Sequence, residues 1–296
     1  MGALKKVSVL FMFFVLVLLL TACGGESEEG AVSENTTNTE TAKTDERWEE
    51  IEKSGELVIG TSGTLIAASF YDDNDELTGY DVEVLREVAN RLNLEASFEI
   101  MGVDSMLPAV DSGRIDVAAN DMTITEKRLE QFNFSEPYKY SYTTMAVRTD
   151  DNSEIESLED LEGKKAGGGA TTVYSQIAEH YGAEVVTYGN APNEAYLRDV
   201  HNGRTDLVMN DYYLTKFGVA AFPDFDIHLH PTLMFYPTEQ AVIIPKDADV
   251  LTEKINEAIL EMHEDGTMTE LAIEFYEEDA SRKPEGDIEE IDGIEL

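Results

Sequence analysis

The sequence predicts an α/β protein whose two lobes face each other across a cleft. Two observations carry this prediction: short apolar strands alternate with amphipathic helices from Glu56 onward, and one strand-and-turn pattern occurs twice. Strands that alternate with helices pair in parallel and carry helices on their faces. The chain from about residue 46 to residue 278 is long enough for two lobes of medium size.

The first half of the chain shows the alternation in order. Three strands are expected, at residues 57–60, 98–100 and 115–119. Between the first two, apolar residues recur at the spacing of a helix over residues 82–92. A second helix is expected to end at Gly113, because glycine readily adopts the left-handed conformation that terminates helices.

A near-repeat is the most informative internal feature. The segment DSGRIDVAAND, from Asp111 to Asp121, is matched ninety residues later by HNGRTDLVMND, from His201 to Asp211. Each copy predicts a helix end, a glycine turn, a buried strand and a polar Asn-Asp pair at the strand's carboxyl end. Because ligands of open α/β sheets bind beyond the carboxyl ends of strands, the copies predict facing halves of one cleft. The simpler interpretation is a common helix-to-strand turn that occurs twice by chance.

Residues 1–22 are expected to be a secretory signal peptide. Lys5 and Lys6 precede an apolar run from Val7 to Leu20, which is shorter than the roughly 20 residues of a membrane-spanning helix. The run ends in LTACG, a pattern that resembles a bacterial lipobox centred on Cys23. Acylation of Cys23, for example with palmitate, would anchor the mature chain to the extracellular face of the cell membrane. The alternative is a plain signal peptide with an incidental cysteine.

Residues 23–45 and 279–296 are strongly acidic. The first stretch also lacks large apolar side chains, so we expect a disordered tether behind the lipidated cysteine. The second stretch is expected to be an acidic tail that frays. The whole chain carries 61 acidic and 21 basic residues, a formal net charge of −40. This charge disfavours nucleic acid and anionic membrane surfaces as partners.

Arg128 is the first candidate for ligand binding. Thr125 is placed to cap a short helix whose first turn carries Arg128. A cation there opposes the helix dipole, and an anion bound beside it would more than offset the cost. Arg128 and the Thr123 hydroxyl are therefore predicted to bind a carboxylate, the guanidinium group through two parallel hydrogen bonds. A solvated surface arginine is the plainer interpretation.

A glycine-rich turn in the second lobe is the second candidate. Gly167-Gly168-Gly169-Ala170 leads into Thr171 and Thr172, which precede a predicted helix. Such a turn offers free backbone N–H groups to an anion, and either threonine hydroxyl adds a donor. The segment lacks the lysine of a phosphate-binding loop, and many such turns have no ligand.

Asp211 is the candidate for the cationic end of a ligand. It closes the second copy of the near-repeat and supplies the anion that an ammonium group needs, with Asp121 expected to help. Asp211 is equally suited to cap the helix that starts at Tyr212, a role that aspartate often fills.

Five segments of this sequence resemble the polar amino-acid binding proteins of ABC importers. These segments, in their order along the chain, are Gly60-Thr61, Gly79-Tyr80-Asp81-Val82, Ser112-Gly113-Arg114-Ile115-Asp116, Thr123-Ile124-Thr125-x-x-Arg128 and Phe134-Ser135-x-Pro137-Tyr138. The similarity covers about residues 57–275. It implies a type II periplasmic-binding-protein fold, a Venus flytrap with two crossover strands at the hinge, and a soluble partner for a permease.

The resemblance also implies roles for individual residues. Arg128, Thr123 and Thr172 would bind the α-carboxylate of an amino acid, and Asp211 would bind its α-ammonium group. Tyr80 matches an aromatic position that packs on the ligand side chain.

The segments YLRDVHNGRTDLVMNDYYLTKFGVAAFP, HLHP and EDGTMTEL look most like the L-cystine-binding lipoproteins of Gram-positive bacteria. In this chain Thr64-Leu65-Ile66-Ala67-Ala68-Ser69 stands where the family has an aromatic, proline-rich stretch. With Leu65 where a stacking ring is expected, the pocket would be roomier beside Thr64.

From these features we expect lobe 1 at residues 46–146 and 241–278 and lobe 2 at 147–240, with hinge strands crossing near Val147 and Gln240. We expect a monomer whose partners are an amino acid and the transmembrane subunits of an ABC permease.

Two other functions stay open from the sequence. A dehydratase on the same fold would need a proton donor in the cleft, and Asp211 would serve only if burial raised its pKa. The second open function is a binding module that reports to a membrane sensor. No cofactor or metal is expected, because the histidines, among them His201, His228 and His230, lack the ligand set of a zinc site.

Overall fold

Two β-sheets form the framework of the computed structural model, which describes residues 39–189, 191–286, 288–291 and 293–296. All of these residues belong to one unit, residues 38–296. The predicted signal peptide, Cys23 and most of the predicted tether lie outside the described residues. Among the described helices, none is long and apolar enough to cross a membrane.

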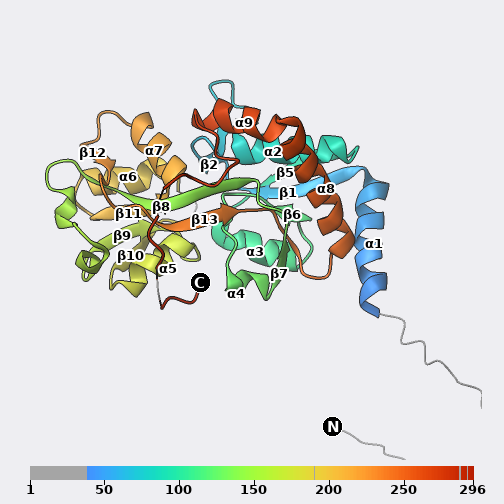
Figure 1. Cartoon of the computed structure of the whole chain (residues 1–296), viewed down its shortest axis with the longest axis horizontal. Helices are drawn as coiled ribbons and strands as arrows, with labels where there is room; N and C mark the ends of the chain where they lie inside the picture. The colour runs from blue at the N-terminus through green and yellow to red at the C-terminus, as the bar shows by residue number, and fades with distance from the viewer. Residues whose placement is uncertain (1–38, 190, 287, 292) are drawn as a thin grey trace, which may run out of the picture. The chain divides into compact units, whose positions relative to one another are not determined.

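The first lobe is built on a five-stranded sheet with the order β5-β1-β6-β14-β7 (Figure 1). Its strands are β1 (Glu56–Thr61), β5 (Glu95–Ile100), β6 (Val117–Ala118), β7 (Phe132–Phe134) and β14 (Ile243–Pro245). The strand β1 runs parallel to β5 and β6, as the alternation of strands and helices predicts, whereas β14 returns antiparallel to β6 and β7.

Helices cover both faces of this sheet. They are α1 (Thr39–Ser54), α2 (Tyr80–Arg91), α3 (Val103–Asp111), α4 (Glu126–Leu129), α8 (Asp249–Asp265) and α9 (Thr267–Tyr276). Alternate residues of β1 point to opposite faces. Leu57 and Ile59 pack with α2 and α8, whereas Val58 packs with the α3 residue Met106. The helix α1 begins at Thr39, so the end of the predicted tether is helical.

The second lobe is built on a six-stranded sheet. Its strands are β8 (Lys139–Arg148), β9 (Lys165–Gly168), β10 (Glu184–Thr187), β11 (Leu207–Asp211), β12 (Ile227–Leu229) and β13 (Phe235–Gln240). The helix α5 (Val173–His180) packs on one face, and α6 (Asn193–His201) and α7 (Tyr212–Ala221) pack on the other. The short 3₁₀ helices η1 (Asn152–Glu154) and η2 (Leu158–Leu161) follow β8.

The crossover strands at the hinge are β8 and β13, which pair antiparallel from Lys139 opposite Gln240 to Thr143 opposite Phe235. The expected return near Gln240 agrees with this pairing. The expected outward crossing near Val147 is wrong, because that residue pairs with Leu207 inside the second sheet. The chain has already left the first lobe at Lys139, since the strand β8 is long enough to serve both the hinge and the second sheet.

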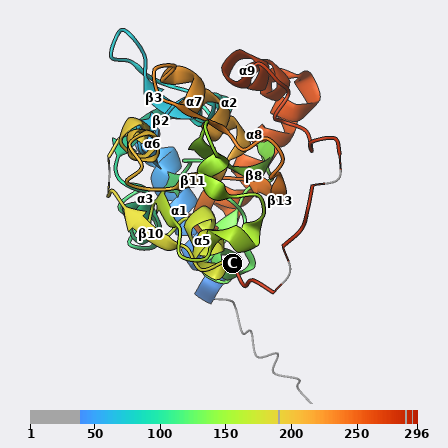
Figure 2. The same ribbon diagram turned by 90° about the vertical axis from the view of Figure 1, so that its left-hand side faces the viewer.

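The last segment of the chain does not fray. Figure 2 shows it leaving α9 and running to the C-terminus. The amide of Tyr236 donates to the Glu289 carbonyl at 2.6 Å, and Leu296 is 8% exposed in the core cluster of the second lobe. The Leu296 carbonyl accepts a hydrogen bond from the amide of Lys127 at 3.0 Å. The prediction of a frayed tail was wrong because it rested on the acidic composition, whereas the few apolar residues in the second half of the tail pack against the second lobe.

Candidate ligand-binding site

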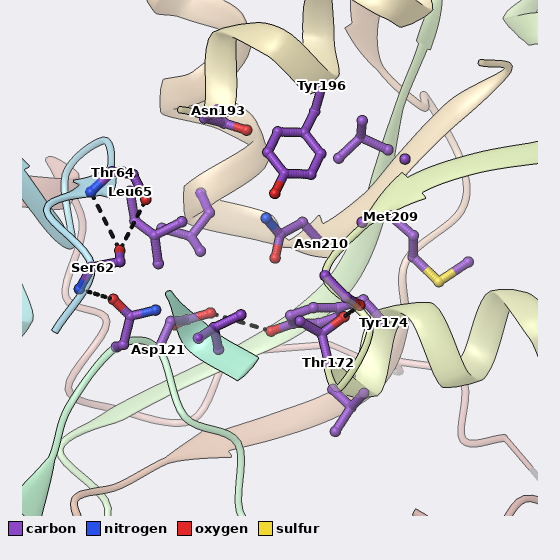
Figure 3. Close-up of a pocket in the computed structure, with 18 of the residues that line it drawn as sticks. Ser62, Thr64, Leu65, Asp121, Thr172, Tyr174, Asn193, Tyr196, Met209 and Asn210 are labelled. Carbon is purple, nitrogen blue, oxygen red and sulfur yellow. Dashed lines mark hydrogen bonds between the residues drawn. The ribbon is translucent and has the colours of Figure 1, made fainter. Parts of the chain in front are cut away.

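A cavity between the lobes is lined from both sheets (Figure 3). About 840 Å³ of empty space lies within it, including the part open to solvent. The first lobe contributes Ser62, Thr64, Leu65, Val103, Asn120, Asp121, Met122, Thr123 and Arg128. The second lobe contributes Gly167, Gly168, Gly169, Thr172, Val173, Tyr174, Gly189, Ala191, Asn193, Tyr196, Val208, Met209, Asn210 and Leu214.

The near-repeat places its two polar pairs at this cavity. Asn120 and Asp121 follow β6, and Asn210 and Asp211 end β11. Three of these four residues lie on the cavity wall, and Asp211 does not. The Asn120 side-chain oxygen accepts a hydrogen bond from the amide of Ser62 at 2.9 Å, which fixes the loop after β1. The repeated pattern therefore places residues of both lobes on the walls of one cavity.

Arg128 lies on the wall as a cation without an anion. Its amide donates to the Thr125 hydroxyl at 3.3 Å, so the predicted helix cap is present. Its guanidinium group donates to the carbonyls of Thr123 at 2.8 Å and Thr171 at 3.2 Å. Among the described residues no carboxylate pairs with it, and burial lowers the pKa of Arg128. The guanidinium group is therefore fixed by main-chain carbonyls and keeps its charge for a ligand.

The two threonines of the glycine-rich turn have different roles. Thr172 lines the cavity and caps α5, accepting from the amide of Ser175 at 3.2 Å. Thr171 is not on the wall, contrary to the prediction. Its amide and hydroxyl donate to Asp104 of the first lobe at 3.1 and 2.8 Å. Thr171 therefore closes the cleft because its side chain faces the helix α3 across it.

The glycines of this turn bring the backbone close to its neighbours. A Cβ atom on Gly168 would lie 2.3 Å from the Ser175 hydroxyl, and one on Gly169 would lie 3.3 Å from Val103 of the first lobe. A side chain at Gly169 would therefore press on the first lobe, whereas one at Gly168 would clash with the helix α5 of its own lobe.

A buried cluster of charges lies beside the cavity. The Lys139 ammonium group is 2.5 Å from Asp121 and 2.9 Å from Asp211, and its side chain is 0% exposed. The amide of Asp121 donates to the buried Asp81 carboxylate at 2.5 Å. Burial raises the pKa of Asp81 to about 6 and that of Asp121 to about 7, although the charge of Lys139 opposes both shifts.

Lys139 was not among the residues predicted from the sequence to lie at the site. As the first residue of a strand with alternating burial, a lysine is expected to face solvent, and only the tertiary fold gathers three carboxylates around it. Burial disfavours its charged form, and the neighbouring carboxylates reverse that effect and raise the pKa of Lys139.

Asp211 is a structural residue in this arrangement. Its carboxylate accepts from the amide of Leu214 at 3.1 Å, which is the helix cap that the sequence left open, and pairs with Lys139. The side chain is fully buried and off the cavity wall. The position expected to bind an ammonium group is therefore paired with Lys139 through Oδ1, while its buried Oδ2 atom has no hydrogen-bond partner among the described residues.

Tyr80 is also absent from the cavity wall, contrary to its predicted contact with a ligand. The first residue of α2, it is fully buried, and its hydroxyl donates to the Tyr138 carbonyl at 2.6 Å. Its ring lies 5.1 Å from that of Tyr276 in the core of the first lobe. The side chain belongs to the core because α9 packs against α2 on this side of the sheet.

Thr64 and Leu65 line the cavity, in the strand β2 (Thr64–Leu65) of a small sheet with β3 (Ser69–Tyr71) and β4 (Leu77–Thr78). Figure 3 shows Asn193 and Tyr196 on the side of the cavity away from Asp121, with Asn210 between. Asn193 and Tyr196 were missed, since nothing in the sequence around α6 distinguishes them from surface residues.

Comparisons with known proteins agree with this architecture. The family model for bacterial extracellular solute-binding proteins, family 3, matches residues 57–278. The chain is 47% identical to the probable ABC transporter extracellular-binding protein YckB of Bacillus subtilis, over 96% of this chain and 97% of that protein. It is 31% identical to the L-cystine-binding protein TcyA of the same species, over 94% of this chain and all of that protein.

The crystal structure of YckB from Bacillus subtilis superposes with a TM-score of 0.66 and 51% identity, covering 83% of this chain and 99% of that one. The expected two-lobed type II periplasmic-binding-protein fold is confirmed. By the match over residues 57–278, the chain belongs to the bacterial extracellular solute-binding proteins, family 3.

Proposed function

We propose that this protein captures an amino acid outside the cell and delivers it to the transmembrane subunits of an ABC importer. The single observation that carries the proposal is the guanidinium group of Arg128, which lies on the cavity wall with two main-chain carbonyls and no carboxylate partner among the described residues. A desolvated cation without a counter-ion is costly, so the site is built to receive an anion. The α-carboxylate of an amino acid is that anion.

Capture works by closure of the two lobes. A ligand carboxylate bound to Arg128 and Thr123 of the first lobe also lies within the half of the cavity that Thr172 and the glycine-rich turn line. A ligand that contacts both lobes binds the closed state more tightly than the open state and shifts the population toward it. The closed form is then the one that a permease recognises.

The substrate we propose is L-cystine or a related sulfur amino acid. The support is the 31% identity to a protein named as an L-cystine-binding protein. Among the described residues of the cavity wall, no side chain other than Arg128 and Asp121 is charged, and Leu65, Val103 and Met209 make the wall partly apolar. Such a wall favours ligands with a long, uncharged middle part. We also propose a lipid anchor at Cys23 and a monomeric state.

An enzyme on the same fold is the second candidate. The observation that favours it is Asp121, an acid on the cavity wall whose pKa burial raises to about 7. A group with that pKa suits proton transfer. Turnover of a cyclohexadienyl acid by the purified protein, abolished by Asp121→Asn, would favour this candidate.

Calorimetric titration of refolded, ligand-free protein tests the proposal. The panel is the twenty common L-amino acids together with L-cystine and L-cystathionine. The proposal predicts saturable binding of at least one member, and the substrate assignment predicts that a sulfur compound binds most tightly. Absence of binding across the whole panel would reject amino-acid capture, whereas tight binding of a different amino acid would reject only the substrate.

A further inference from the structure

We propose that the segment after α9 is a strap that ties the two lobes together in the closed arrangement. The strap comprises the described residues 279–286, 288–291 and 293–296. Figure 1 shows it descending from α9 across β8 and β13 to the short helix α4, and in Figure 2 it runs along the side of the molecule opposite β2 and β3. None of its described residues lies on the cavity wall, so the strap acts on closure without touching a ligand.

The strap begins in the core of the first lobe and follows the hinge. Ala280 is fully buried in the same core cluster as Tyr276 of α9. The Ala280 carbonyl accepts a hydrogen bond from the amide of Tyr140 at 2.8 Å, and Lys283 pairs with Glu239 at 2.6 Å. Tyr140 and Glu239 are opposite each other in the pairing of β8 with β13. The first part of the strap therefore lies against both hinge strands.

The strap then pairs with β13 at an irregular point. This strand has a bulge between Phe235 and Pro237, where Tyr236 falls outside the register with β8 and has a positive φ of 46°. A side chain in the left-handed region is strained, so its surroundings must hold it there. The amide of Tyr236 donates to the Glu289 carbonyl at 2.6 Å, and an isolated parallel bridge joins Phe235 to Glu289. The strap therefore supplies the acceptor for a backbone amide that the bulge leaves outside the ladder.

The end of the strap contacts both lobes at once. The Leu296 side chain lies in the core cluster of the second lobe, against which Ile291 and Ile294 also pack. The Leu296 carbonyl accepts a hydrogen bond at 3.0 Å from the amide of Lys127, which belongs to α4 of the first lobe. Lys127 precedes Arg128, whose guanidinium group also bonds to the second lobe. An arrangement with the lobes together satisfies both the apolar and the polar contact of Leu296.

These contacts couple the strap to closure. A group that makes its contacts in only one of two states shifts the population toward that state. The strap has one end in the core of each lobe, and its last carbonyl meets α4, so its docking favours the closed state. A ligand that favours the same state is coupled to the strap. Release of the strap weakens ligand binding, and a bound ligand strengthens docking by the same factor.

The double variant Ile294→Asn/Leu296→Asn tests the anchors of the strap in the second lobe. Glu295→Gln, at the exposed position between them, is the matched control. Circular dichroism establishes that each variant is folded, and Leu296→Asn alone replaces a double variant that does not fold. Hydrogen exchange of the Tyr236 and Lys127 amides, which donate to strap carbonyls, reports docking. Both amides should exchange faster in the double variant and at the wild-type rate in the control. Wild-type exchange in the double variant would overturn the inference.

Closure is measured without a ligand, by pulsed electron paramagnetic resonance. Spin labels are placed with Asp111→Cys, at the exposed end of α3, and Thr187→Cys, at the exposed end of β10, in a chain that carries Cys23→Ser. These positions belong to different lobes. The double variant should show a larger share of long distances between the labels than the wild-type strap. An unchanged distribution, with both strap amides released, would overturn the inference, because the strap would then stabilise only the core of the second lobe.

The effect on affinity rests on the proposed function and is measured separately. Calorimetry uses the amino acid of the panel that binds the wild type most tightly. The double variant should bind it at least roughly fivefold more weakly, and the control should bind it like the wild type. Saturating ligand should also slow exchange of the Lys127 amide in the wild type. Equal affinities in all three proteins would contradict the coupling. If no panel member binds the wild type, the proposed function fails, and the distance measurement still decides whether the strap stabilises closure.

Discussion

The guanidinium group of Arg128 donates a hydrogen bond of 3.2 Å to the main-chain carbonyl of Thr171, and so connects the two lobes at the binding cavity. Beside it, Thr171 donates from its amide and its hydroxyl to Asp104 of the first lobe. The residue proposed to bind the ligand carboxylate is therefore part of the contact between the two lobes.

Asp104→Ala should weaken ligand binding without touching the ligand. The variant removes two hydrogen bonds to Thr171 that form only when the lobes are close, and each contributes about 0.5–1.5 kcal/mol. We expect the affinity measured by calorimetry to fall by that sum at most, since both residues are exposed. Asp111→Ala, at the far end of the same helix, is the matched control and should have no effect. Equal affinities of both variants would show that this contact does not stabilise closure.

Folding stability should decrease as the pH rises from about 4 to about 7 through the contribution of Asp121. Burial raises its pKa from 3.8 to about 7 in the folded protein, so the folded state binds a proton that the unfolded state releases in this range. The stabilisation from the protonated Asp121 is complete below the pKa of the unfolded state and is lost as the pH rises through the pKa of the folded state. Urea unfolding at pH 5 and pH 8 should give a smaller difference in Asp121→Asn than in the wild type. An unchanged difference would mean that Asp121 does not titrate in this range.

Ligand affinity, unlike folding stability, should increase as the pH rises. In the proposed function a ligand ammonium group near Asp121 would favour the ionised carboxylate, so affinity should rise with pH between about 5 and 8, the range set by the raised pKa of about 7. Titration calorimetry of the wild type at several pH values measures this slope, and Asp121→Asn should flatten it. A slope that survives in the variant would point to another titrating group.

Leu296→Ala should destabilise the second lobe. The Leu296 side chain is 8% exposed in a core cluster that includes Met145 and Phe235. Loss of most of a buried leucine side chain costs on the order of 2 kcal/mol, with less at a chain end where the site can collapse. Thermal unfolding should show a lower Tm for this variant. Glu295→Ala, at an exposed neighbouring position, is the control and should leave the Tm unchanged. Equal Tm values would mean that the terminal segment contributes little to stability in solution.

Much of the fold could be predicted because its signals are local. Alternating strands and helices, the glycine turn at Gly113 and the cap at Thr125 are set by residues within a few positions of each other. The near-repeat added one long-range inference, that two Asn-Asp pairs face each other, and three of its four residues do line the cavity.

The rest depends on contacts between distant residues. Lys139 meets Asp121 and Asp211 only after both lobes and the hinge have formed. Tyr80 was placed by analogy at the ligand, but the packing of α9 takes its ring into the core. For the terminal segment, the acidic composition predicted fraying, but a few apolar side chains pack against the second lobe and hold the segment in place.

The most direct test of the account is calorimetric titration of Arg128→Ala with the amino acid that the wild type binds most tightly. The exposed Arg114, which pairs with Glu99 outside the cavity, provides the control Arg114→Ala. We predict a loss of about 2–5 kcal/mol in binding free energy for Arg128→Ala and none for the control. Wild-type affinity in Arg128→Ala would contradict the claim that this guanidinium group binds the ligand carboxylate.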